Sequence, residues 1–276
     1  MREEGIGMRI AIIGCMVMNR EISRLVSESK NQVRIWWLRQ GLHDTPDLLR
    51  SELQRTIDDI EKENAILRSG FRFEMIVLAY GLCSNGVLGL CSRSIPLVIP
   101  RCDDCISLFL GSADRYRKYF REYPGTYWYN RGWIEQAFTP SKQNYAAMRA
   151  EYAEKYGEEN ADYLMACTND WMTKYSRCGF ITSPDGEDGM YEDDRACESY
   201  AKQAAADFGW KFQKFTGSMA YLYALVNGPW DDSRFLTCPP GSRILADYTN
   251  RKFRSAPCRT DDSSRESSSF RNGRNQ

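Results

Sequence analysis

Histidine is almost absent from this chain, since His43 is the only one among 276 residues. A single histidine excludes metal sites that need several imidazoles and a catalytic apparatus built on a histidine pair. Long apolar runs are missing too. The richest one, residues 75–82, is too short for the roughly 20 residues of a transmembrane helix. We therefore expect no membrane-spanning segment.

The chain also lacks a net charge. Its 37 lysines and arginines balance 37 aspartates and glutamates, so the formal net charge is +0. A neutral chain has no overall field that attracts nucleic acid or an anionic membrane surface, and we expect neither as a partner. Glu3 and Glu4 stand where a secretory signal peptide has basic residues, which predicts a cytoplasmic protein.

The motifs of common nucleotide-binding and hydrolytic enzymes are absent. The chain contains no G-x-G-x-x-G, Walker lysine loop, G-x-S-x-G or H-E-x-x-H sequence. What it does contain is 10 cysteines, too few for a secreted disulfide scaffold of this length. In a reducing compartment these cysteines are core residues, metal ligands or nucleophiles.

Segments typical of strands alternate with helical segments in the first half of the chain. The predicted strands are residues 10–15, 32–38, 74–80 and 95–99. A helix beginning near Pro46 separates the second from the third. This alternation predicts an α/β fold with a doubly wound, largely parallel sheet.

The same alternation returns after a long helical interruption. The interruption consists of residues 106–123, which have helical character, the aromatic residues 126–133 and a charged helical stretch at 142–174. Beyond it, strands are predicted at 178–182, 210–215 and 235–238. Helices are predicted at 192–208 and 219–226. We therefore expect two Rossmann-like lobes, at residues 8–135 and 176–250, joined by a helical connection at 136–175. Polar residues dominate from Arg251, so a disordered tail is expected over 251–276.

Three cysteines stand where predicted strands end. Cys15, Cys83 and Cys105 follow the first, third and fourth strands. The carboxyl ends of parallel strands meet at one edge of a sheet, where α/β proteins bind ligands, so we expect these thiols to converge. Three thiolates could hold zinc with its fourth position open, or an iron–sulfur cluster with one free iron. The alternative is that they are buried free cysteines, which behave as small hydrophobic residues.

Cys102 and Cys105 form a C-x-x-C motif before a predicted helix, as in redox dithiols. The intervening Asp103 and Asp104 disfavour thiolates, whereas a redox cysteine needs a lowered pKa. A bound cation would reverse this preference, so metal binding is the better interpretation of the motif. We interpret the cysteines outside these positions as core or incidental residues.

Other polar residues are expected near the same edge. His43 lies in a turn between a strand and a helix and is a candidate fourth ligand, proton carrier or simple turn residue. Ser84 and Asn85 supply possible hydrogen-bond donors for an anion, although an ordinary turn also explains them. Arg101 could clamp a carboxylate or phosphate, or neutralise neighbouring aspartates. The substrate-binding candidates are thus Arg101, Asn85, Ser84 and Asp104, and the catalytic candidates are His43 and Arg101.

Ordered motifs along the chain resemble the family known as domain of unknown function 1638. The motifs are Gly14-Cys15 with Arg20-Glu21, residues 40–44 (QGLHD), 80–86 (YGLCSNG), 95–101 (IPLVIPR), 104–106 (DCI), 110–112 (LGS), 125–127 (GTY) with Gly132-Trp133, and Trp230-Asp231 with Phe235-Leu236 and 239–241 (PPG). The resemblance extends from about residue 8 to residue 248. It implies a protein of bacteria or methanogenic archaea, with a loose association with genes of corrinoid-dependent methyl transfer.

The resemblance also bears on the cysteines. Cys15, Cys83 and Cys105 match cysteine positions of the family pattern and His43 matches its histidine, which favours the metal site. Cys102 stands where the pattern has no cysteine, which argues against a redox C-x-x-C. Asp103 stands where the pattern has a histidine, so a second histidine ligand is not expected.

These observations predict a cytoplasmic α/β protein that binds an iron–sulfur cluster or zinc through Cys15, Cys83 and Cys105. Whether it is an enzyme, acting on a small anionic substrate, stays open. One alternative is an accessory protein of corrinoid-dependent methyl transfer, which would bind a corrinoid protein. Another is a small-molecule binding module with structural cysteines, in which serine at the three positions would leave ligand binding intact.

Overall fold

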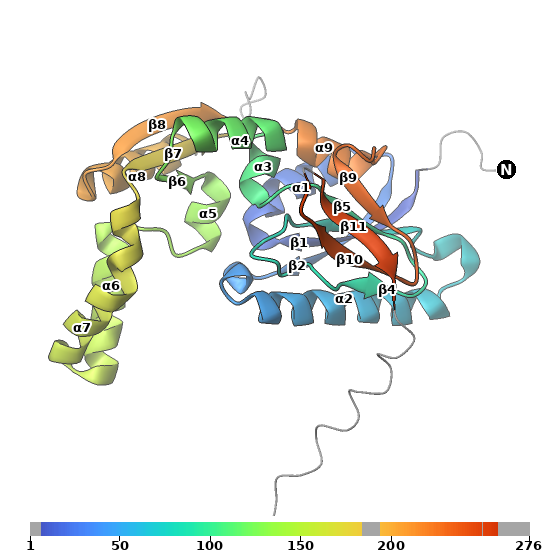
Figure 1. Ribbon diagram of the computed structural model, residues 1–276, viewed down its shortest axis with the longest axis horizontal. Helices are drawn as coiled ribbons and strands as arrows, with labels where there is room; N and C mark the ends of the chain where they lie inside the picture. The colour runs from blue at the N-terminus through green and yellow to red at the C-terminus, as the bar shows by residue number, and fades with distance from the viewer. Residues whose placement is uncertain (1–6, 184–193, 250, 259–276) are drawn as a thin grey trace, which may run out of the picture.

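The computed structural model describes residues 7–183, 194–249 and 251–258, which form a mixed α/β protein (Figure 1). The strands are β1 (Arg9–Cys15), β2 (Gln32–Leu38), β3 (Met75–Ala79), β4 (Cys91–Ser92), β5 (Leu97–Pro100), β6 (Thr126–Tyr129), β7 (Arg177–Thr182), β8 (Lys211–Thr216), β9 (Phe235–Cys238), β10 (Ser242–Asp247) and β11 (Lys252–Pro257). The α-helices are α1 (Asn19–Ser27), α2 (Pro46–Ile66), α3 (Cys105–Phe109), α4 (Ala113–Glu122), α5 (Arg131–Gln136), α6 (Lys142–Tyr156), α7 (Glu158–Asn169), α8 (Asp194–Asp207) and α9 (Ala220–Asn227). Short 3₁₀ helices are η1 (Met16–Met18), η2 (Leu42–Asp44), η3 (Ser69–Phe71) and η4 (Asp170–Lys174).

The central sheet is mostly parallel, as the alternation of strands and helices predicts. Its strand order is β2-β1-β3-β5-β9, in which the first four strands are parallel and β9 runs antiparallel to β5. Successive residues of β1 face opposite sides. Ile10 and Ile12 pack in the core that contains α1 and α9, whereas Ala11 and Ile13 pack in the core that contains α2.

Helix α2 packs on one face of this sheet (Figure 1). It begins at Pro46, whose fixed φ suits the first turn of a helix. Leu49, Leu53, Ile57 and Ile60 recur at helical spacing along it and are fully buried. Each such side chain contributes about 1.5–3 kcal/mol on burial, so this stripe holds the helix against the sheet.

The sheet has a topological switch point between β1 and β3. The chain leaves β1 through α1 to β2 on one side, then crosses back through α2 on the opposite face to β3. At such a point the loops beyond the carboxyl ends of the two strands diverge and leave a crevice. The crevice here lies after Cys15 of β1 and Ala79 of β3.

A second parallel sheet, β6-β7-β8, lies at one end of the molecule (Figure 1). One face, with Trp128, Ile181 and Phe215, joins the core that holds Ile10 and Ile12. The other face packs against α8, where Phe180 is fully buried. In Figure 1, α6 and α7 extend away from this sheet.

The sheets do not follow the boundaries expected at residues 135 and 176. Strand β6 precedes the first boundary but pairs with β7, and β9 follows the second but pairs with β5 of the central sheet. The chain leaves the central unit after α3 and returns before α9. There the main-chain N–H of Ser218 donates a 2.8 Å hydrogen bond to the carbonyl oxygen of Phe109.

A small antiparallel sheet, β11-β10-β4, has no counterpart in the sequence prediction. Residues 252–257 form β11, and Phe253 is fully buried beside Ile244 in the core under α2. This corrects the expectation of a disordered tail from residue 251. One buried aromatic ring and pairing with β10 order a segment whose composition is otherwise polar. Residues 259–276 lie outside the described residues.

Over the described ranges, no helix combines the length and the apolar character that crossing a membrane requires.

Candidate functional site

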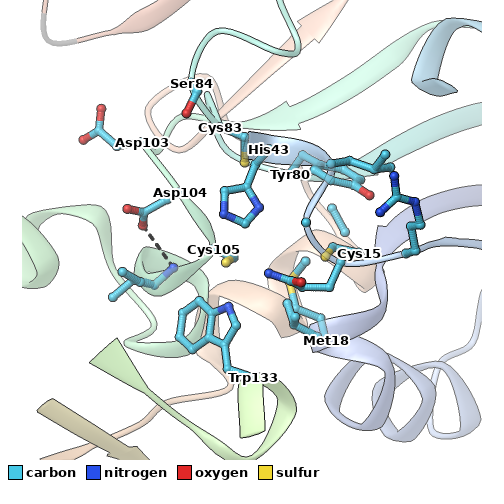
Figure 2. A pocket seen from close by; sticks show the side chains of 17 residues that line it. Cys15, Met18, His43, Tyr80, Cys83, Ser84, Asp103, Asp104, Cys105 and Trp133 are labelled. Carbon is cyan, nitrogen blue, oxygen red and sulfur yellow. Dashed lines mark hydrogen bonds between the residues drawn. The ribbon is translucent and has the colours of Figure 1, made fainter. Parts of the chain in front are cut away.

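A cavity of about 280 Å³ occupies the crevice at the switch point. Its wall is built from the loops that follow β1, β2, β3 and β5, and it includes Cys15, His43, Cys83 and Cys105. Figure 2 shows these four side chains directed toward a common space, with Trp133 at its edge. The three cysteines that the sequence predicts at one edge of the sheet thus line one cavity there.

The loop that carries Cys83 is tied to the loop that carries Cys105. Leu82 donates its main-chain N–H to Cys102 and Cys83 donates to Asp103, each over 2.9 Å. This approach requires Gly81, because a Cβ atom there would lie 2.7 Å from the main-chain nitrogen of Asp104. The glycine thus permits the contact that brings the two cysteines together.

The backbone around Cys83 is strained. Cys83, Ser84 and Asn85 have φ values of 44°, 56° and 69°, a run of left-handed residues without a glycine. The left-handed conformation costs roughly 1–2 kcal/mol per residue. A hydrogen bond of 3.0 Å from the N–H of Gly86 to the carbonyl of Cys83 closes this turn. Strain of this kind is concentrated at functional sites.

Cys105 is the first residue of α3, and Asp104 caps that helix. The Asp104 carboxylate accepts a 3.0 Å hydrogen bond from the N–H of Ile106 and is also hydrogen-bonded to Tyr116. Burial nevertheless raises the pKa of Asp104 to about 6. Its carboxyl group can therefore take up or release a proton near neutral pH.

The three thiols have raised pKa values in this cavity. Burial is the largest cause for each and raises the pKa of Cys83 to about 12, and neighbouring cysteines add to the effect at Cys83 and Cys105. Asp104 raises the pKa of Cys83 further. A cysteine nucleophile needs the opposite shift, so none of the three is activated as a nucleophile by the side chains around it.

Tyr80, directly after β3, also lines the cavity. Its side chain is 4 % exposed, and its hydroxyl group has no hydrogen-bond partner among the described residues. A buried hydroxyl without a partner is destabilising by about 1–3 kcal/mol. A ligand that accepts a hydrogen bond in the cavity would remove this cost.

His43 and Ser84 line the cavity as predicted, and Asp104 does so as well. His43 lies at the mouth with 46 % of its side chain exposed, and its Nε2 lies 3.4 Å from Oδ1 of Asp44. Asn85 is not part of the wall. It faces α2, where its carbonyl oxygen accepts a 3.3 Å hydrogen bond from Arg50.

Arg101 does not reach the cavity, which corrects the expectation that it clamps a substrate anion. Its buried guanidinium donates to the carbonyl oxygens of Asp232, Phe235 and Arg251 at 2.8, 3.1 and 2.7 Å. It also forms a 2.7 Å ion pair with the Asp232 carboxylate. These acceptors belong to β9, β11 and the residues beside them. Arg101 is therefore a structural residue that joins the C-terminal strands to β5.

Cys102 is fully buried in the core and lies outside the cavity wall, in agreement with the rejection of a redox C-x-x-C. Asp103 is paired with Lys252 at the rim. As the side chains stand, no group of three or more histidine, cysteine, aspartate or glutamate residues in the described ranges is arranged to hold a metal ion. The thiols share a cavity without sharing a ligating geometry.

Several wall residues were not predicted from the sequence. Tyr80 and Arg39 follow strands and had a usable signal, because residues beyond strand ends line the crevice. Trp133 had none. It arrives on α5, which packs on η1 because Gly132 lets its backbone lie against the carbonyl oxygen of Val17.

One family model matches the chain, over residues 37–226, and its description is "Protein of unknown function (DUF1638)". This range includes His43, Cys83 and Cys105 and begins after Cys15. None of the curated proteins matches the chain. Because the matched range is more than half of the 276 residues, the chain belongs to the DUF1638 family.

Proposed function

We propose that this protein binds a small molecule in the switch-point cavity, next to zinc or an iron–sulfur cluster held by Cys15, Cys83 and Cys105. The observation that carries the proposal is that three free thiols, from three separate loops, line one cavity of about 280 Å³. Thiolate is the preferred ligand of both kinds of metal centre.

The charge balance of the cavity supports a cation. Without one, burial holds the pKa of each thiol above its ordinary value, and repulsion from neighbouring cysteines adds to this at Cys83 and Cys105. A bound metal ion replaces the thiol protons and offsets that cost. Since the side chains do not form a ligating group as they stand, we expect the three thiols to turn toward one centre on binding.

Side chains of the cavity wall would then bind the ligand and exchange a proton with it. The Tyr80 hydroxyl is a free hydrogen-bond donor in the wall, and Asp104 can hold or release a proton. Arg39 lies at the mouth and has no ion-pair partner among the described residues, so it is the cation best placed to attract an anionic substrate. A metal with an open position would supply Lewis-acid chemistry.

We propose further that the two parallel sheets act as two lobes on either side of the ligand.

Metal analysis tests this proposal. The full chain is purified anaerobically, and iron, acid-labile sulfide and zinc are measured for the wild type and for the triple Cys15→Ser, Cys83→Ser, Cys105→Ser variant. Cys91, Cys167 and Cys258 lie outside the cavity wall, so their triple serine variant is the matched control. We expect stoichiometric metal in the wild type and the control and its loss from the cavity variant.

Two outcomes would contradict the proposal: a folded wild type without metal, or equal metal in both variants. Circular dichroism of the cavity variant shows whether loss of metal reflects loss of fold. A metal-free wild type would favour the other function that the cavity supports, binding of a small molecule against neutral thiols and the Tyr80 hydroxyl.

A further inference from the structure

A second and larger cavity, of about 520 Å³, adjoins the thiol cavity. The two share the same wall at Gln40, His43, Asp104, Ile106 and Trp133. The second cavity extends from this shared wall to β6 and η4, between the edge of the central sheet and the β6-β7-β8 sheet. One ligand can therefore occupy both spaces. We name the second cavity the aromatic cleft.

Half of the residues in the wall of the aromatic cleft are phenylalanine, tyrosine or tryptophan. Tyr127, Trp171 and Tyr175 make one continuous surface, with ring centroids 5.3 to 5.7 Å apart. Phe120 and Phe138 line the same cleft and are 63 % and 52 % exposed. Large apolar rings left exposed around a hollow mark a binding surface rather than a packed core.

The aromatic cleft also carries an unpaired cation. Lys174 lies in its wall, is exposed, and has no hydrogen-bond or ion-pair partner for its ammonium group among the described residues. The wall has one carboxyl group, that of Asp104, at the end shared with the thiol cavity. An anionic group is thus favoured at the Lys174 end and not at the shared end.

We infer that the aromatic cleft is a second subsite for the ligand of the thiol cavity, and that it takes a planar aromatic group with an anionic substituent near Lys174. This inference rests on the proposed function for the other half of the ligand. A ring stacked on an aromatic side chain gains about 0.5–1.5 kcal/mol beyond its area burial. The volume of about 520 Å³ accommodates a fused ring system.

Binding of 2-naphthoate to the full-length protein tests the inference, with cyclohexanecarboxylate as the non-aromatic match. Affinity is measured by isothermal titration calorimetry for the wild type, Phe138→Ala and Lys174→Gln. The control is Tyr248→Ala, which removes a fully exposed ring outside the cleft. We expect each cleft variant to weaken naphthoate binding by about 5- to 10-fold, corresponding to about 1–1.4 kcal/mol, and the control to leave it unchanged.

The inference is overturned if 2-naphthoate does not bind, if cyclohexanecarboxylate binds equally well, or if the cleft variants bind naphthoate as the wild type does. The triple serine variant of the thiol cavity separates this result from the metal proposal, because none of the three cysteines lines the aromatic cleft. Cleft-dependent naphthoate binding in a metal-free wild type would contradict the metal proposal alone. Stoichiometric metal with cleft-independent binding would contradict this inference alone.

Discussion

The main-chain N–H of Cys83 donates a 2.9 Å hydrogen bond to the carbonyl oxygen of Asp103. Together with the bond from Leu82 to Cys102, it joins the loop after β3 to the loop after β5. The relative position of Cys83 and Cys105 is therefore set by the main chain. Side-chain packing only has to orient the two thiols.

Gly81→Ala should separate these loops. The new Cβ would meet main-chain atoms of Asp103 and Asp104 at 2.7 to 2.9 Å, which no side-chain movement relieves. We expect a loss of about 2 kcal/mol in the free energy of unfolding, measured with urea, and reduced metal content. The control is Gly70→Ala, where a Cβ meets nothing within 4 Å. Equal effects of the two substitutions would contradict the role of Gly81.

The cavity thiols should react slowly in metal-free protein. Because burial raises the pKa of Cys15, Cys83 and Cys105, little thiolate is present at pH 8. We expect their alkylation by iodoacetamide to be more than about tenfold slower than that of the exposed Cys167. Mass spectrometry of peptides from timed reactions measures each rate. Fast reaction at the cavity in metal-free protein would contradict the raised thiol pKa values.

Glu21→Gln should stabilise the protein at high pH. Burial raises the pKa of Glu21 to about 7, and one carboxyl oxygen has no hydrogen-bond partner among the described residues. The folded state therefore binds this proton more tightly than the unfolded state, whose glutamate has a pKa of about 4.3. Wild-type stability falls as the pH rises between these two values, and the variant lacks that fall.

We expect the Gln variant to be about 3–4 kcal/mol more stable than the wild type at pH 8 and within about 1 kcal/mol of it at pH 4.5. Urea unfolding at both pH values measures the difference. Glu28→Gln removes an exposed carboxylate from the end of the same helix and serves as the control. A stabilisation by Glu21→Gln that does not change with pH would rule out this explanation.

Arg101→Met should destabilise the fold and leave the cavity chemistry intact. The substitution removes the donors to four carbonyl oxygens of the C-terminal segments, those of Asp232, Phe235, Arg251 and Phe253. We expect a loss of about 3 kcal/mol in urea unfolding, with metal content per folded molecule unchanged. Arg254→Met, at an exposed position of β11, is the matched control. Loss of metal from folded Arg101→Met protein would contradict a purely structural role for Arg101.

Much of the central sheet can be predicted from the sequence, because its strands are apolar runs that end at recognisable turns. The prediction for the cysteines follows from those strands alone, since Cys15, Cys83 and Cys105 each follow a strand of one parallel sheet. Nothing more than strand ends is needed to bring them to one edge.

The small antiparallel sheet and the role of Arg101 could not be predicted. Strand β4 has two residues, and β11 has Phe253 as its single large apolar residue, so neither has a periodic pattern. The guanidinium of Arg101 finds its partners only once β9 and β11 lie beside β5. The aromatic cleft depends in the same way on tertiary packing, because Trp133 and Trp171 come from segments far apart in the chain.

The main-chain hydrogen bond from Ser218 to Phe109 joins the two points between which the second sheet is inserted into the central unit. The chain departs from and rejoins the central unit at this single crossing, and none of the described residues in between supplies a strand to the central sheet. The entropic cost of closing such a loop grows only with the logarithm of its length. The inserted segment can therefore lengthen or shorten in other members of the family at little cost to the central fold. Such changes would remodel the wall at Trp171 and Lys174 and leave the three cysteines of the thiol cavity in place, because all three lie outside the insertion.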